Sequence, residues 1–528
     1  AALIVLPALA ALLWRRRAGG SRILRFLTLG VLLPGGVTAL AAAAVLGAPP
    51  VADVFEDGHA LLPASEYLRG ELPYRDIVPG HGLLSDGLFH AAGLDLLGDD
   101  YRGYSRANKL AGALFWPCFY AIGLAATGNP ASGFWVMALS FLCFPQYAFP
   151  RVIASLAALA LALLASRTGK PWAWRACGAL LTFNLCVSID FAAYAAGAAA
   201  TALLVARGDR RAQARALFSG AALSAAALGT VFAAAGILGD FFHTTFRFVP
   251  GLLPAYAQGF PALVLPKGSP SALFADPLAV LYIVAAAALI LLGAELPRGS
   301  RVSDGARAAL PVLTWIVLAM LSVLERQHVG YPFFAVPAAL VLLGRWFRAP
   351  GAARRLRTAL AAASLFGFAW LRSPWLLAMS VAGVIRHPAL PPDAAPLSEP
   401  RRARGAIFRL HDRTLIVKTA DMMRRAGFRA GDTWFDFANE PGLYFLFDRR
   451  CPIRYYEVAF YESDRAQREV IDAVARNPRV RAALVRSAYP PIDGIPNAVR
   501  APLVDRFLRE RFCPFFDEDG IEFWLRRP

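Results

Sequence analysis

The fold of this chain is decided by apolar runs such as ACGALLTFNLCVSIDFAAYAAGAAATALLVA, which occupies residues 176–206. A helix needs roughly 20 apolar residues to cross a bilayer, so this run is too long for one crossing and short for two. It is interrupted at Ser188, Ile189 and Asp190, where its one carboxylate lies. We therefore expect two short helices that meet near Asp190.

The whole chain has the composition of a membrane protein. It has 528 residues, of which 57% are hydrophobic and 17% are charged, and its mean hydropathy is +0.46. Soluble domains average about 45–50% apolar and about 25% charged residues. The excess apolar surface therefore has to be buried in lipid, and this composition excludes a soluble enzyme.

Other apolar runs lie on both sides of residues 176–206. We expect membrane segments at residues 1–14, 23–47, 110–126, 134–149, 152–165, 216–238, 277–293, 309–324, 331–344 and 358–384. Because the sequence begins at Ala1 rather than at a methionine, the first of these is expected to be the end of a span or of a signal-anchor. The pattern predicts a polytopic α-helical membrane protein with about 11–13 membrane segments.

The basic residues predict the side on which each connection lies. The formal net charge is +18, and the positive residues stand in short clusters between the apolar runs. The positive-inside rule places such clusters in the cytoplasm, so no nucleic-acid partner is needed to explain them. If residues 176–206 cross twice, every cluster falls on the same side, at residues 15–25, 167–175, 207–215, 298–307 and 345–357. We therefore expect these parts outside: residues 48–109, 240–276, the turn 325–332, and the tail from Arg386 onward.

The tail has the pattern of a soluble domain. After a Pro/Ala-rich tether at residues 385–400, helical spacing alternates with strand-like alternation. Helices are expected at residues 415–426, 464–476 and 503–511, and strands at 433–437, 480–486 and 521–525. This order predicts a small extracytoplasmic α/β domain over residues 401–528, separate from a transmembrane module over residues 1–384.

Two of the six cysteines, Cys451 and Cys513, lie in the polar tail, and the other four lie in apolar stretches without metal-ligand spacing. We expect Cys451 and Cys513 to be free thiols, and a disulfide between them is the alternative if the tail lies in an oxidising compartment.

Residues suited to chemistry gather in the first outer loop, residues 48–109. Glu56 and Asp57 stand side by side close to a span, and a carboxylate at the membrane face is suited to act as a general base toward a hydroxyl acceptor. The alternative for such a pair is an ordinary solvated acidic loop. The same loop also holds His59, Tyr74, Arg75, Asp76 and His81.

Two more groups of ionisable residues lie at the expected outer end of the bundle. Asp190 marks the helix break, and Arg326 and His328 lie in a turn between two apolar helices. Charges near lipid are costly to desolvate, so they are functional candidates, and a guanidinium with an imidazole suits a phosphate. The alternatives are a polar side chain at Asp190 that reaches the interface and an Arg326 that snorkels beside a turn histidine.

Several short sequence strings in the loop and the tail are similar to those of a known family. They are Glu56-Asp57-Gly58, GELPYRD at residues 70–76, a Gly-His-Gly that leads into an apolar helix, FDF at 435–437, NEP at 439–441, LY at 443–444 and DGIPN at 493–497. This combination resembles bacterial GT-C glycosyltransferases, which include protein O-mannosyltransferase and aminoarabinose-transferase relatives. The turn Arg326-Gln327-His328 is similar to an Arg-x-x-His-type turn in bacterial members, although it is one residue shorter.

The resemblance implies a multi-pass enzyme of the bacterial inner (plasma) membrane. Such an enzyme moves a hexosyl or pentosyl group from a polyprenyl-phosphate carrier to a glycan, lipid or protein acceptor outside the cytoplasm. It implies Asp57 as the general base, with Glu56 as its neighbour and substitute. The candidates for binding the donor phosphate are Arg326, His328 and Arg75, and those for binding the donor or acceptor sugar are His59, Tyr74, Asp76, His81 and Asp190.

We expect no obligatory cofactor. Some GT-C enzymes use a divalent ion, and Glu56, Asp57, His59 and His81 are ligand types for one. The absence of a Gly-rich phosphate loop in the sequence favours a lipid-linked donor over a nucleotide sugar.

Two other functions stay open. One is a transporter or flippase of lipid-linked sugars, which predicts charged residues near the middle of spans. The other is a scaffold whose tail binds a partner. Under the enzyme interpretation the tail is expected to be an accessory that shapes acceptor access, so that removal of residues 393–528 leaves donor binding intact.

Overall fold

The chain folds into two compact units that interleave along the sequence. The first unit consists of residues 1–48, 109–228 and 259–388, and the second of residues 49–108, 229–258 and 389–528. The computed structural model describes residues 27–47, 50–143, 150–252, 302–323, 334–335, 338–339, 341–342, 390, 392–487 and 494–528. The expected segments at 1–14, 277–293 and 358–384, most of 331–344, and the turn with Arg326 and His328 lie outside the described residues.

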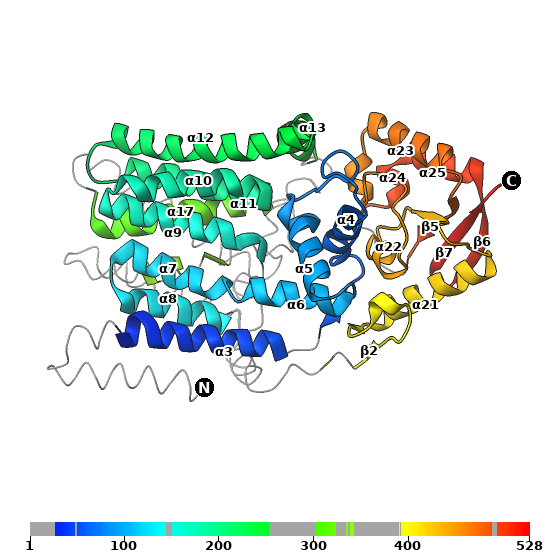
Figure 1. Cartoon of the computed structure of the whole chain (residues 1–528), viewed down its shortest axis with the longest axis horizontal. Coiled ribbons are helices and arrows are strands. Elements are labelled where there is room, and N and C mark those ends of the chain that lie inside the picture. The colour runs from blue at the N-terminus through cyan, green and yellow to red at the C-terminus, as the bar shows by residue number, and fades with distance from the viewer. Residues whose placement is uncertain are drawn as a thin grey trace, which may run out of the picture. The chain divides into compact units, whose positions relative to one another are not determined.

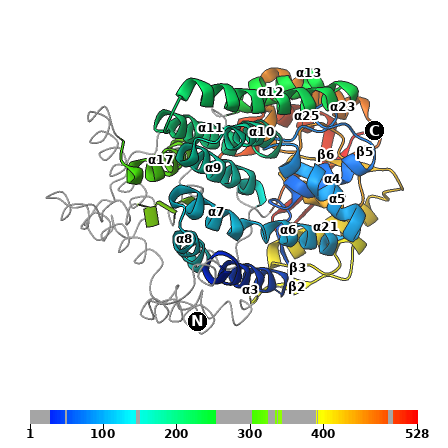
Figure 2. The same ribbon diagram turned by 60° about the vertical axis from the view of Figure 1, so that its left-hand side comes forward.

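The first unit is a bundle of helices. After a π-helical segment, Thr28–Leu32, come α3 (Leu33–Gly47), α7 (Phe115–Thr127), α8 (Pro130–Cys143), α9 (Pro150–Thr168), α10 (Pro171–Val187), α11 (Ile189–Leu204), most of α12 (Arg210–Ala234) and α17 (Asp304–Val323). Both ribbon views show these helices side by side with roughly parallel axes (Figures 1 and 2). Phe115, Trp116, Phe191 and Trp315 are among the large side chains of its core.

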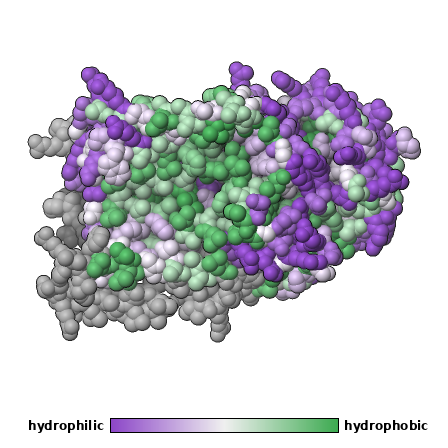
Figure 3. Space-filling model, in the orientation of Figure 1, coloured by the Kyte–Doolittle hydropathy of each residue, from purple (hydrophilic) through white to green (hydrophobic). Residues whose placement is uncertain are grey.

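Four helices of the described residues are long and apolar enough to cross a membrane. They are Tyr101–Thr127, Pro150–Thr168, Arg210–Ala234 and Asp304–Leu321. Hydrophobic residues cover much of the surface of the helical bundle, and hydrophilic residues gather on the second unit (Figure 3). The prediction of a mostly helical chain with apolar, membrane-length helices and a sheet region near the C-terminus is confirmed.

The predicted break in residues 176–206 is confirmed. Helix α10 ends at Val187 and α11 begins at Ile189, because the backbone of Ser188 between them is extended, with φ −163° and ψ 120°. Asp190 lies in the first turn of α11, where a negative charge is favoured by the helix dipole.

The second unit contains two sheets. The small sheet has the order β1-β3-β2 and consists of β1 (Val51–Ala52), β2 (Ala395–Pro396) and β3 (Ile407–Phe408). The larger sheet has the order β4-β5-β7-β6 and consists of β4 (Thr433–Asp436), β5 (Val480–Arg486), β6 (Phe512–Glu518) and β7 (Ile521–Arg526). In the larger sheet β4 and β5 are parallel, and the other pairs are antiparallel.

The helices of the second unit come from all three of its segments. They are α4 (Gly58–Leu68), α5 (Phe89–Leu97), most of α6 (Tyr101–Gly112), α13 (Leu238–His243), α14 (Val249–Gly251), α21 (Leu410–Arg425), α22 (Gly442–Leu446), α23 (Asp464–Arg476), α24 (Asn497–Arg500) and α25 (Pro502–Arg511). Short π-helical or 3-10 segments occur at Leu84–Leu88, Thr244–Phe248, Arg401–Ala403 and Val458–Tyr461. In the view of Figure 1, α23 and α25 lie above strands β5 and β7, and α21 lies below them.

All six predicted elements of the tail are present, and α23 and β5 begin and end at the predicted residues. Strand β6 was not predicted. Most of its residues are exposed, so it lacks the alternation of a half-buried strand, and it contains Pro514, which an edge strand tolerates.

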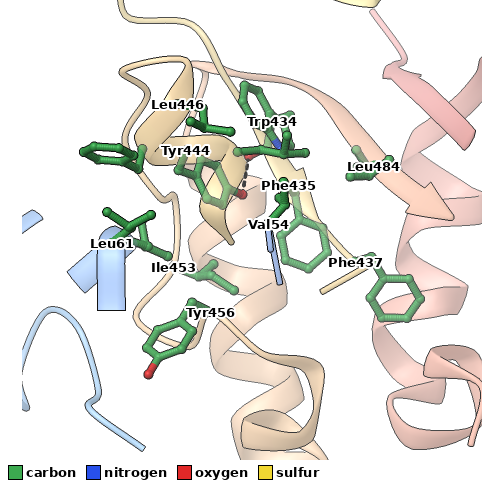
Figure 4. Close-up of a cluster of buried hydrophobic side chains, with 14 of the residues drawn as sticks. Val54, Leu61, Trp434, Phe435, Phe437, Tyr444, Leu446, Ile453, Tyr456 and Leu484 are labelled. Atoms are coloured by element: carbon green, nitrogen blue, oxygen red, sulfur yellow. Dashed lines mark hydrogen bonds between the residues drawn. The ribbon is translucent and has the colours of Figure 1, made fainter. Parts of the chain in front are cut away.

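The first outer loop and the tail share one hydrophobic core. Val54 and Leu61 of the loop pack with Trp434, Tyr444 and Tyr456 of the tail, and the Tyr444 hydroxyl donates to the Trp434 carbonyl at 2.9 Å (Figure 4). Strand β1 of the loop pairs with β3 of the tail. The boundary therefore differs from the predicted one: the loop belongs with residues 401–528, because the tail buries its apolar side chains.

Cys451 and Cys513 are both free thiols, so the disulfide considered between them is not formed. Cys451 is half-buried and Cys513 is exposed.

Candidate functional site

Asp57 is held in a turn that leads into α4. Asp53 Oδ1 accepts hydrogen bonds from the amides of Phe55 at 3.1 Å and Glu56 at 2.9 Å, in the manner of a residue that caps a helix N-terminus. The amide of Asp53 in turn donates to Asp57 Oδ2 at 2.9 Å. The hydrogen bond from the Asp53 amide holds the Asp57 carboxylate in a half-buried position. The neighbouring Glu56 is exposed.

Two tyrosines of α6 complete the surroundings of Asp57. Tyr104 donates its hydroxyl to Asp57 Oδ1 at 2.8 Å, and Tyr101 donates to Oδ2. Residues three apart lie on the same face of a helix, so both phenols reach one carboxylate. A carboxylate has about four acceptor positions, and hydrogen bonds from the described residues use three of those of Asp57. Oδ1 therefore retains capacity for one further donor.

Neither tyrosine was predicted as a site residue. The one signal in the sequence is their spacing of three at the start of a helix that continues into an apolar run.

Burial changes the proton affinity of Asp57. Removal of water raises its pKa to about 6, although the hydrogen bonds from Tyr101, the Asp53 amide and Tyr104 act in the opposite direction. A general base works best when its pKa lies near the operating pH. The carboxylate of Asp57 therefore has both the position and the proton affinity of a base at neutral pH.

The tail adds a second buried carboxyl group, Asp412, next to the same turn. Asp412 is 2% exposed, and its Oδ1 accepts from the amide of Val54 at 3.3 Å. His411 Nε2 lies 3.3 Å from its Oδ2. Burial, followed by the charge of Asp53 and further by that of Asp57, raises the pKa of Asp412 to about 7. Two carboxyl groups from distant parts of the chain therefore titrate in one region near neutral pH.

The two predicted sugar-binding histidines of the loop come together. The rings of His59 and His81 lie 5.7 Å apart between centroids. His59 Nε2 lies 3.4 Å from Glu457 Oε2 of the tail, and His81 Nδ1 lies 3.1 Å from Asp86 Oδ1. Each imidazole therefore has a carboxylate beside one ring nitrogen.

The string Tyr74-Arg75-Asp76 makes packing contacts. Tyr74 is 1% exposed, and its ring packs edge-on against Phe232 and Phe241. Arg75 Nε lies 3.3 Å from Asp240 Oδ2, and its guanidinium also donates to the Gly236 carbonyl.

Asp76 Oδ2 accepts from the amide of Leu72 at 2.8 Å, so among the described residues its carboxylate holds a turn and makes no ion pair with Arg75. These contacts give all three residues a part in the folding of the loop. A role of Tyr74, Arg75 or Asp76 at a substrate stays a prediction.

Asp190 lies in the other unit. Arg151 donates to Asp190 Oδ2 at 2.8 Å, and Ser188 donates to its Oδ1. The structure therefore groups Glu56, Asp57, His59 and His81 in one unit and places Asp190 in the other. Arg326 and His328 lie outside the described residues.

Among the residues that the structure describes, no group of three or more His, Cys, Asp and Glu side chains is arranged to hold a metal ion. Comparison with models of known protein families gives no match for this chain. Comparison with curated proteins gives no match either. The function of the chain is therefore inferred from its own residues and their geometry.

Proposed function

We propose that this chain is a GT-C-type glycosyltransferase of the bacterial inner membrane. It moves a sugar from a polyprenyl-phosphate donor to a hydroxyl of a glycan, lipid or protein outside the cytoplasm, with Asp57 as the general base. The observation that supports this most directly is the half-buried Asp57 carboxylate, which two tyrosine hydroxyls hold and whose pKa burial raises to about 6. The membrane-length helices fit a donor that is itself anchored in lipid.

The proposed reaction is a single displacement at the anomeric carbon. The acceptor hydroxyl donates a hydrogen bond to Asp57 and passes its proton to the carboxylate as its oxygen bonds to the anomeric carbon. The bond between that carbon and the phosphate oxygen breaks, and its electron pair stays on the phosphate. Tyr101 and Tyr104 keep the carboxylate in place while the proton is transferred.

Glu56 fits the role of base less well. Its side chain is exposed, and among the described residues its carboxylate makes no hydrogen bond that would orient it. It is therefore the matched control for Asp57: a neighbouring acidic residue of the same turn without the tyrosine contacts.

A transporter or flippase of lipid-linked sugars is the second candidate. The observation that favours it is the ion pair between Arg151 of α9 and Asp190 of α11, because charges inside a helical bundle often mark a transport path.

The test is the transfer of labelled sugar from a panel of polyprenyl-phosphate sugars to membrane extracts. The enzyme proposal expects transfer by the wild type, loss of transfer with Asp57→Asn, and retention of most transfer with Glu56→Gln. Movement of lipid-linked sugar between the leaflets of vesicles, without transfer from any donor, would contradict it and support the flippase.

A further inference from the structure

A buried carboxylate holds His81 from two directions. Asp86 is 2% exposed, and its Oδ2 accepts from the backbone amide of His81 at 2.7 Å while its Oδ1 lies 3.1 Å from His81 Nδ1. The hydroxyl of Tyr456, from the tail, donates to the same Oδ2 at 3.0 Å. The side chain of His81 is nevertheless 30% exposed, so a ligand can reach it.

Glycines on both sides make this arrangement fit. A Cβ on Gly80 would overlap the ring of Phe460, so the chain can lie against the tail only with a glycine there. Gly87 has φ +123°, and a Cβ on it would lie 2.7 Å from the Pro63 Cβ. Gly80, next to His81, is therefore explained by a backbone that approaches the tail closely.

Asp86 lies beside Nδ1 of His81, so Nε2 is the ring nitrogen that is available to a ligand. When the imidazole carries both protons, Nδ1–H donates to the Asp86 carboxylate, and Nε2–H can donate to a ligand. Among the described residues, the hydrogen bonds of His81 go only to Asp86. The ring of His59, itself backed by Glu457, lies beside it. Two adjacent imidazoles, each backed by a carboxylate, form a site for an anion with several acceptor oxygens.

We infer that His81, with His59 beside it, binds the phosphate of the polyprenyl-phosphate sugar and donates a hydrogen bond from Nε2 to the oxygen that leaves the anomeric carbon. This inference rests on the proposed function and adds to it the group on the leaving side. When the carbon–oxygen bond breaks, its electron pair goes to that phosphate oxygen, which takes the Nε2 proton of His81. The proton of the acceptor goes to Asp57, so the protons balance.

The chemistry of the two partners is matched. The phosphate that leaves the sugar becomes a monoester with a second pKa of about 6, so it can take the proton that His81 gives up. Arg75 is the loop residue that the resemblance assigned to phosphate binding, but it is paired with Asp240.

The groups that face Asp86 and His81 permit a test by pH. Burial raises the pKa of Tyr67 and of Tyr456 well above the usual value, and burial lowers the pKa of His90 to about 4, so these three stay neutral between pH 5 and pH 8. Asp86 and Glu457 are the acidic groups beside the two imidazoles. Phosphate binding that needs the charged form of an imidazole should weaken as pH rises.

The experiment measures the binding of a polyprenyl-phosphate sugar, a phosphodiester that keeps one negative charge, to the full-length protein in nanodiscs from pH 5.5 to pH 8. The wild type is expected to lose about tenfold in affinity across this range, which corresponds to about 1.4 kcal/mol. His81→Gln should lower the affinity at the acidic end about tenfold and flatten the pH profile, and His59→Gln should do so more weakly. His243→Gln, an exposed histidine of the same unit, is the matched control and should change nothing.

Two further measurements show whether the site binds the lipid-linked phosphate or free phosphate. Uncharged polyprenol should bind without pH dependence, and inorganic phosphate should compete only at concentrations far above that of the lipid. Displacement by inorganic phosphate at equal concentration would show a site for free phosphate and overturn the assignment to the lipid.

The outcomes also separate this inference from the proposed function. If the wild type transfers sugar and Asp57→Asn abolishes transfer, while His81→Gln keeps wild-type affinity and pH profile, the phosphate assignment is wrong and the glycosyltransferase stands. If no donor supports transfer, the proposed function fails whatever the His81 variants show. Unchanged thermal unfolding of His81→Gln excludes misfolding as the cause of lost binding.

Discussion

Tyr104 donates its hydroxyl to Asp57 Oδ1 at 2.8 Å across 47 residues of sequence. The bond joins the turn of the outer loop to the first turn of α6, which continues into an apolar, membrane-length helix. The candidate base is therefore attached to the helix that leads away from it, as well as to its own turn. A hydrogen bond to the ionised carboxylate favours the charged form, so Tyr104 also lowers the pKa of Asp57.

Tyr104→Phe removes one donor while it leaves the ring in place. The pKa of Asp57 should rise above about 6, because burial is then opposed by one hydrogen bond fewer. The acidic limb of the pH dependence of transfer should shift to higher pH, and the rate at pH 6 should fall about three- to tenfold. Tyr455→Phe, which removes a hydroxyl that bonds to Glu469 in the same unit, is the control and should leave the profile unchanged.

The buried carboxyl groups predict how stability depends on pH. The pKa values of Asp57 and Asp412 are raised to about 6 and about 7 in the folded state, so the folded state holds these protons more tightly than the unfolded state. Their stabilising contribution is fully present below the ordinary carboxyl range near pH 4, and it is lost as pH rises through pH 6–7. The melting temperature of the second unit should therefore be higher at pH 5 than at pH 8.

Asp412→Asn tests whether the buried carboxyl groups cause this pH dependence of stability. An uncharged amide has no ionisation cost, so the variant should lose much of the pH dependence and melt higher than the wild type at pH 8. A gain of about 1 kcal/mol corresponds to about 2–4 °C. Asp421→Asn, at a half-buried carboxylate paired with the exposed Arg424 on the same helix, is the control. A wild-type pH dependence in Asp412→Asn would contradict the assignment.

The contact between loop and tail predicts a large effect at Gly58. A Cβ there would overlap the amide nitrogen of Gly442, whose N–H donates to the Val54 carbonyl at 3.1 Å. Gly58→Ala should therefore destabilise the second unit by about 1–3 kcal/mol, as measured by denaturant unfolding. Gly239→Ala, where nothing lies within 4 Å of the added Cβ, should not destabilise it comparably.

The shared core also revises the expectation for the tail. Because Val54 and Leu61 are buried by tail residues, removal of residues 393–528 should expose the loop to protease and abolish donor binding. Intact donor binding and a protease-resistant loop in that truncation would show that the loop folds without the tail.

Helix α23 and the helix break at Ser188 were predictable because residues close to them in the sequence determine them. Helix α23 is amphipathic and begins after Ser463, whose hydroxyl accepts from the amide of Ala466 at 3.3 Å, so both its face and its start are visible in the sequence. The helix break was predictable because Asp190 interrupts an apolar run. Strand β6 was not, because an exposed edge strand needs no hydrophobic alternation.

The site was predictable only in its local part. Asp57 stands out because it lies next to Glu56 close to an apolar span and because the resemblance implies a base there, but Tyr101 and Tyr104 approach it from another helix. Asp412 is 358 residues away from Val54, to which it bonds. Contacts between such distant segments arise from the packing of the loop on the tail and leave no periodic signal in the sequence. The burial of Tyr74 against Phe232 and Phe241 was not predictable for the same reason, and its role at a substrate stays a prediction.

The most direct test of Asp57 as the base is the turnover number of Asp57→Asn at saturating donor, with donor affinity measured in parallel. Asp57→Asn should lower turnover at least about 100-fold, the lower range for general base catalysis, and should keep donor affinity within about threefold of the wild type. Glu56→Gln, in the same turn, should keep most of the turnover. Turnover of Asp57→Asn close to that of Glu56→Gln, in a folded protein that binds donor, would contradict the role of Asp57 as the base.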